Sequence, residues 1–149
     1  KTGGLATVRF PDYRLAYEGI ESPNILVFLG QVELFRTLLI TAPPSKEQAK
    51  NIDYMLAAGE LFTLIVYGQL ILENAKLYST NADVLEQIFT FMVQDFSTQA
   101  LQMILGQENS AAQEEIFNKM IKKPVKDADG FKRVWQMVYD LKGQYIMNE

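Results

Sequence analysis

The chain has 149 residues, 48% of them hydrophobic, and its 14 basic and 18 acidic side chains give a net charge of −4. That length suits one domain with a single core, and the acidic balance argues against a nucleic-acid-binding protein, because phosphate contacts need clustered lysines and arginines. The lack of cysteine and histidine excludes disulfides, Ser-His-Asp and Cys-His catalysis and the common zinc sites.

Residues 1–21 are predicted to form an N-terminal arm. Residues 3–10 alternate weakly between apolar and polar, which fits an extended arm or a short strand, and residues 11–18 fit one or two helical turns closed by Gly19. The chain begins Lys-Thr-Gly-Gly, with neither a methionine nor a signal-peptide pattern. We therefore expect a piece of a longer protein.

The first long helix is predicted from Pro23 to about Thr41. Ser22 is a favourable N-cap, proline is favoured at the first helical position, and two further prolines stop the helix. The residues expected inside the bundle are Ile25, Leu26, Phe28, Leu29, Val32, Phe35, Leu38 and Leu39.

A long central helix is predicted to begin with the Ser-x-x-Gln capping box at 45–48 and to run to about Tyr78. Residues 53–80 are apolar around most of a helical circumference, so this helix is expected to lie inside the others. Gly59 and Gly68 predict places where a neighbouring helix or side chain comes close to its backbone.

A third helix is predicted from the Thr-x-x-Asp pattern at 80–83 to about Leu105, where Gly106 ends it. Its apolar residues recur at the three- and four-residue steps of an amphipathic helix. They are Leu85, Ile88, Phe89, Met92, Phe96, Ala100, Met103 and Ile104.

Two shorter helices are predicted after it. The Ser-x-x-Gln pattern at 110–113 caps a fourth helix to about Lys122, Pro124 breaks the chain, and Asp127 opens a fifth helix closed by Gly143. The apolar stripe of the fifth helix is Phe131, Val134, Trp135, Val138 and Leu141. Its tryptophan is expected in the core or in an interface.

Short loops between long helices favour antiparallel neighbours. The prediction is an all-α fold, an up-and-down bundle of four to five helices over residues 22–149. No run approaches the roughly 18 to 20 apolar residues of a membrane span, because polar residues interrupt both long apolar helices. We therefore expect a soluble, cytoplasmic protein without a transmembrane segment.

Carboxylates inside the long helices raise the question of a metal site. Glu60, Glu73 and Asp95 could contribute to a bundle-type dimetal site, but such sites use Glu-x-x-His pairs, which this chain lacks. We predict no metal site. Asp95 is expected to be a helix-surface acid or the partner of a lysine.

Basic residues are concentrated near the C-terminal end. Between Glu60 and Asn118 the chain has eight acids and one base, whereas residues 119–133 hold six bases and two acids. Such a run is either a solvated surface or a contact for an anionic subunit, phosphate ligand or lipid headgroup. Its candidate interface residues are Lys122, Lys123 and Lys126.

Three segments carry a family resemblance: LAAGELFTLIVYGQLILENAKL at 56–77, VLEQIFTFMVQDFSTQAL at 84–101 and IKKPVKDADGFKRVWQMV at 121–138. Their pattern of helices and small residues resembles the C-terminal helical extension of the long-form acyl-CoA dehydrogenases, over roughly residues 25–141. The resemblance implies a parent flavoenzyme that uses FAD to remove hydrogens from Cα and Cβ of a fatty acyl-CoA. Its electrons would pass to an electron-transfer flavoprotein.

The family's flavin and substrate bind mainly to elements that this chain lacks. The resemblance therefore implies no cofactor in this fragment and no catalysis by it alone. Its expected partners are the catalytic domains of the parent chain and other copies in a homo-oligomer.

One tripeptide bears on catalysis. Tyr17-Glu18-Gly19 resembles the family's Tyr-Glu-Gly-Thr, whose glutamate abstracts the α-proton. Here Ile20 stands in place of the threonine, and Pro23 begins a helix where the family is already inside one. Glu18 is thus a catalytic candidate, and the prediction is the alternative, an exposed acid in a turn.

The sequence predicts an accessory domain that docks on the catalytic body or stabilises the oligomer. The alternative is a self-contained helical interaction module whose basic end binds an acidic partner or a membrane surface. The apolar faces of the first and central helices exceed what one core stripe needs, so docking through the first helix is expected. The candidate residues there are Leu26, Val32, Leu34 and Leu38.

Overall fold

The computed structural model describes residues 12–105 and 109–144. Regular structure within these ranges is helical, without strands, which confirms the all-α prediction. The elements are α1 (Arg14–Tyr17), α2 (Pro23–Thr41), the 3-10 turn η2 (Gln48–Lys50), α3 (Ile52–Tyr78), α4 (Ala82–Leu105), α5 (Ala111–Met120) and α6 (Ala128–Asp140). The arm or strand expected at 3–10 and the helix end expected at Gly106 lie outside the described residues.

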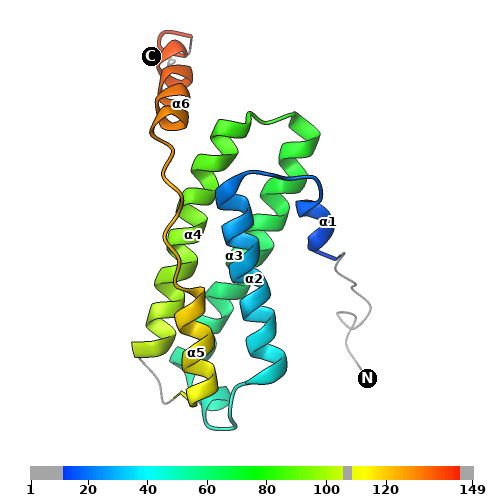
Figure 1. Ribbon diagram of the computed structural model, residues 1–149, viewed down its shortest axis with the longest axis vertical. Coiled ribbons are helices and arrows are strands. Elements are labelled where there is room, and N and C mark those ends of the chain that lie inside the picture. The colour runs from blue at the N-terminus through cyan, green and yellow to red at the C-terminus, as the bar shows by residue number, and fades with distance from the viewer. Residues whose placement is uncertain (1–11, 106–108, 145–149) are drawn as a thin grey trace, which may run out of the picture.

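The long helices α2, α3 and α4 run up and down beside one another, as predicted, and α5 covers the lower part of the bundle (Figure 1). Helix α4 packs against α2, α3, α5 and α6, and α1 packs against α3. After α5 the chain runs along α4 in extended form, and α6 projects beyond the end of the bundle. We call residues 121–127, between α5 and α6, the linker.

The core lies between α2, α3, α4 and α5, and its aromatic part joins α2 and α4. Edge-to-face pairs join the ring of Phe28 to those of Phe89 and Phe96, with centroids 5.4 and 5.7 Å apart. Phe117 on α5 is fully buried beside them. Such pairs contribute about 0.5–1.5 kcal/mol each beyond their area burial, so they help to fix how α2 packs on α4.

Two predicted helix starts move to nearby asparagines. The capping box at 45–48 forms, with Gln48 N–H to Ser45 Oγ at 3.1 Å, but it lies at the turn that leads into η2, whose N-cap is Glu47, and it does not start α3. The N-cap of α3 is Asn51, and Asn81 rather than Thr80 accepts the first free N–H groups of α4. Asparagine is among the best N-caps, because its short side chain reaches the N–H two or three residues on.

The predicted box at 110–113 caps α5, and its glutamine pairs with that of the first box. Gln48 and Gln113 each donate from Nε2 to the other's Oε1 at 3.1 Å. Gln113 Nε2 also donates to the carbonyl of Ala42 at 3.2 Å. The two capping glutamines therefore join the end of α2, η2 and the start of α5.

Helix α3 does not lie inside the other helices, which corrects the expectation from its apolar sequence. Phe62 is 54% exposed and Leu70 is 56% exposed, whereas Leu61 and Leu72 are buried. Within the described structure, α3 packs one side against α1, η2 and α4. An all-round apolar sequence shows that a helix can be covered on every side, but not that this chain covers it.

The two glycines of α3 differ. A Cβ built on Gly68 would lie 2.5 Å from Cε1 of Phe28, so this glycine is required for the close approach that was predicted. A Cβ on Gly59 would meet no atom within 4 Å. Gly59 faces away from the bundle, and nothing in the described structure explains it.

Two of the described helices, α2 and α3, are long and apolar enough to cross a membrane on length and composition. The expectation that no stretch approaches a membrane span therefore fails on that criterion. The most apolar window of α2 is 39% buried and that of α3 is 17% buried. The core helix of a soluble protein passes the same test, so this finding alone places neither helix in a membrane.

Candidate docking surfaces

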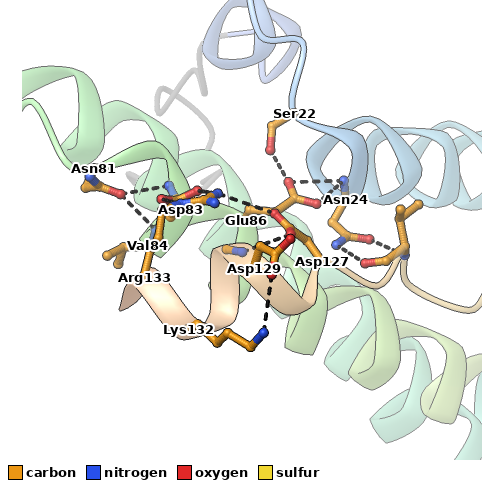
Figure 2. Close-up of polar contacts among 12 residues, drawn as sticks. Ser22, Asn24, Asn81, Asp83, Val84, Glu86, Asp127, Asp129, Lys132 and Arg133 are labelled. Atoms are coloured by element: carbon orange, nitrogen blue, oxygen red, sulfur yellow. Dashed lines mark hydrogen bonds and ion pairs between the residues drawn. The ribbon is translucent and has the colours of Figure 1, made fainter. Parts of the chain in front are cut away.

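The start of α2 is capped by a side chain from another helix (Figure 2). Glu86 of α4 accepts hydrogen bonds from the hydroxyl of Ser22 and from the backbone N–H of Asn24, the latter at 3.0 Å. Ser22 occupies the predicted N-cap position, but its side chain accepts no capping bond within α2, and its hydroxyl donates to Glu86 instead. A carboxylate at this end of a helix also interacts favourably with the helix dipole.

Asn24 fastens the linker to α2 and α4. Its Oδ1 accepts from the N–H of Val125 at 2.7 Å, and its Nδ2 donates to the carbonyl of Val125 at 2.9 Å and to Oγ1 of Thr90 at 3.0 Å. Asn24 is fully buried. One amide side chain thus pairs with an extended backbone as a neighbouring strand would.

A second buried amide holds the other end of the linker. Gln31 Nε2 lies 2.8 Å from the carbonyl of Met120 and 3.0 Å from Oγ of Ser97. Ser97 Oγ in turn accepts from the N–H of Lys122 at 2.9 Å. The path of the linker along the bundle is therefore fixed at both ends, and it determines where α6 starts.

Helix α6 is attached to the bundle by an ion pair on its polar side. The Arg133 guanidinium donates from Nε and Nη2 to the two carboxylate oxygens of Asp83, at 2.6 and 2.7 Å (Figure 2). These hydrogen bonds hold the pKa of the Asp83 carboxyl below its usual value. Asp127 caps α6, as predicted, by accepting from the N–H of Gly130 at 2.8 Å.

The apolar side of α6 faces solvent. Phe131, Trp135 and Val138 are 56%, 64% and 61% exposed, and we call them the outer face of α6. At about 100° per residue they lie on the opposite side of the helix from Arg133. Of the two alternatives left by the sequence, the described structure excludes the core for Trp135.

A second bare apolar surface runs along α3. Its residues recur at three- and four-residue steps along one exposed side of the helix, and we call them the outer face of α3. They are Met55, Leu56, Gly59, Phe62, Val66 and Leu70. All except the half-buried Val66 are exposed.

Two grooves border this outer face. One, of about 280 Å³, lies between α2 and α3 and is lined by apolar side chains including Phe35, Leu39, Phe62 and Ile65. The other, of about 410 Å³, lies between α3 and α4 beside Leu70. Pockets of this kind receive the aromatic anchors that dominate protein interfaces.

The interface residues predicted on α2 divide into two groups. Val32 and Leu38 are each 1% exposed and belong to the core, which corrects their assignment to a docking face. Leu26 is 47% exposed and Leu34 is partly buried. The sequence alone does not distinguish apolar residues on the buried side of a helix from those on its exposed side. Only the packing of the folded chain shows which side is buried.

The three lysines predicted for an interface lie on the linker. Lys122, Lys123 and Lys126 are exposed, and no ion pair is found for them within residues 12–105 and 109–144. Other bases of the run are engaged locally. Lys119 pairs with Glu115 at 2.6 Å, and Arg133 with Asp83.

The catalytic and metal candidates do not form a site. Glu18 is the exposed C-cap of α1, ahead of Gly19 at φ +74°, which is the predicted turn. Glu60, Glu73 and Asp95 are exposed on separate helix faces. No cluster of acids that could hold a metal ion is present in the described part of the chain.

Sequence reasoning missed the buried polar residues that place α6. Asn24, Gln31 and Glu86 looked like ordinary polar positions of amphipathic helices, since their partners lie about 60 to 100 residues away in the chain. One signal was available in the sequence, since each of these three polar residues interrupts an otherwise apolar helix face.

Comparison with known proteins adds no further assignment, because no family model, curated protein or solved structure matches this chain.

Proposed function

We propose that this chain is a non-catalytic helical docking domain whose outer faces on α3 and α6 are covered by protein. The observation that carries the proposal is the orientation of α6. Its polar side is used for attachment through Arg133 and Asp83, while its aromatic side points away from the bundle. Large contiguous apolar surfaces of this kind are uncommon on monomeric proteins and mark interaction sites.

A more specific form of the proposal takes the covering protein to be the catalytic body of an acyl-CoA dehydrogenase-like flavoenzyme, in the cytoplasm. Its support is the residue resemblance in segments 56–77, 84–101 and 121–138. FAD, acyl-CoA and electron-transfer flavoprotein would then belong to the parent enzyme. A reading frame for a flavin-type dehydrogenase directly upstream of Lys1 would support this form, and an unrelated upstream frame would refute it.

The docking function is tested by asking whether the outer face of α6 stabilises the isolated chain. Phe131→Ser and Trp135→Ser should change the free energy of unfolding by less than about 0.5 kcal/mol, because both side chains are already solvated. The matched control, Phe117→Ser, removes a fully buried ring and should cost at least roughly 3 kcal/mol. Urea unfolding followed by circular dichroism measures both.

A loss above about 1 kcal/mol on substitution of Phe131 or Trp135 that does not change with protein concentration would mean that these rings pack within the chain. The docking proposal would then fail.

For the parent enzyme, Glu18→Gln should leave turnover nearly unchanged, whereas loss of a true general base lowers the rate about 10²- to 10⁴-fold. A loss of that size would return Glu18 to the catalytic site.

A further inference from the structure

We infer that the outer face of α6 docks on the outer face of α3 in a second copy of this chain. The inference rests on the proposed docking function and names its partner. Within residues 12–105 and 109–144 both faces are bare in one copy, and α6 is held with its apolar side turned away from its own bundle. A second copy offers a cover for both faces at once.

The outer face of α6 fits within the outer face of α3. The former spans residues 131–138, about 12 Å, and the latter spans residues 55–70, about 24 Å. The α6 face offers large rings at Phe131 and Trp135, while the α3 face has an open backbone at Gly59 and apolar grooves on both sides. Bulky anchors on one helix and a glycine between grooves on the other allow close packing.

Charge favours the same pairing over a lipid surface. Glu60 and Glu73 lie on the exposed side of α3, and Lys126 lies exposed on the linker just before α6; no ion pair is found for these three among the described residues, whereas Lys132 on α6 already pairs with Asp129 at 3.4 Å. Opposite charges at the rim steer association and make it salt-dependent. An anionic membrane would attract the α6 end but repel the acidic flanks of α3, so it would leave the α3 face uncovered.

Two such contacts exchanged about a two-fold axis give a closed dimer. Each copy then supplies one α6 face and one α3 face. Two-fold symmetry of this kind is the commonest symmetry among soluble homo-oligomers. The exchange also gives Gly59 a use, since any larger residue there would hold the partner helix further away.

The single tryptophan is the probe. Trp135 is 64% exposed in one copy, so its fluorescence emission should shift to shorter wavelength as the concentration of the full chain rises from nanomolar to high micromolar. Sedimentation over the same range should show a monomer–dimer equilibrium that weakens with salt. Leu70→Asp, an exposed position on α3, should weaken the dimer at least roughly tenfold while leaving the helical circular dichroism unchanged.

Cross-linking tests the pairing directly, because the chain has no cysteine of its own. Thr63→Cys and Val138→Cys chains, mixed and treated with a short bis-maleimide, should give a mixed dimer in higher yield than either chain alone, because Thr63 is exposed next to Phe62 on α3 and its substitution leaves Gly59 intact. The matched control pairs Val138→Cys with Lys46→Cys, an exposed residue outside α3's outer face, in the loop before η2, and should give little product.

Three different results would overturn the inference, and each would point to a different explanation. A chain that stays monomeric with unshifted Trp135 emission would remove the second copy but leave docking on a different protein intact. An emission shift produced only by anionic lipid vesicles, and absent with neutral ones, would replace the second copy by a membrane surface. A dimer that Leu70→Asp does not weaken, or that cross-links equally through Lys46→Cys, would place the contact elsewhere.

Discussion

Replacing Asn24 by alanine should release the linker without unfolding the bundle. The substitution removes two hydrogen bonds to the backbone of Val125 and one to Thr90, at 2.7 to 3.0 Å. A hydrogen bond contributes about 1 kcal/mol net, and water can reach the half-exposed Val125 once the linker lifts. We therefore expect a local loss of about 2 to 3 kcal/mol, which raises the opened population about 30- to 150-fold.

Hydrogen exchange at the Val125 amide and the rate of tryptic cleavage after Lys126 both report that opened population when opening and closing are fast. Asn24→Asp should open the linker as well, because it keeps the acceptor for the Val125 N–H but loses both donors of the amide. Asn118→Ala is the control, since that side chain is exposed and makes one bond within its own helix. Unchanged exchange and cleavage in Asn24→Ala would show that the amide does not hold the linker.

Three further results are expected from urea unfolding and fluorescence. Gly68→Ala should destabilise the chain by about 1–2 kcal/mol, because the added Cβ meets the buried ring of Phe28 at 2.5 Å. Gly59→Ala should instead stabilise dilute protein by up to about 1 kcal/mol, because alanine favours a helix more than glycine does. Equal effects of the two substitutions would refute this account of the packing. Leu38→Asp should unfold the bundle, since it buries a charge, whereas Leu34→Asp should leave it folded. The pKa of Asp83 is lowered in the folded chain by its arginine partner, so α6 attachment should hold above the ordinary carboxyl pKa and weaken as pH falls through the lowered value. Local motion of the sole tryptophan, followed by fluorescence anisotropy, should increase over that range in wild type but not in Asp83→Asn.

Local chemistry was sufficient to predict the helices. Pro23 can begin a helix but not continue one, and the capping groups at 110–113 and Asp127 satisfy N–H groups two or three residues away. Where prediction failed, as at the starts of α3 and α4, a competing asparagine stood within six residues of the predicted cap. These interactions are short in sequence, so the sequence alone nearly determined the helix boundaries and the all-α fold.

The docking surfaces depended on tertiary structure. The sequence indicated surplus apolar surface and a basic segment, but it assigned docking to α2, where Val32 and Leu38 proved to be core. Periodicity defines the apolar side of a helix and does not say whether that side faces inward or outward. For α6 that choice was made by Arg133 and Asp83, 50 residues apart, and by a linker held through buried amides about 90 to 100 residues upstream. Only the folded chain brings those groups together, and so only the tertiary structure decided which apolar faces remain free to bind.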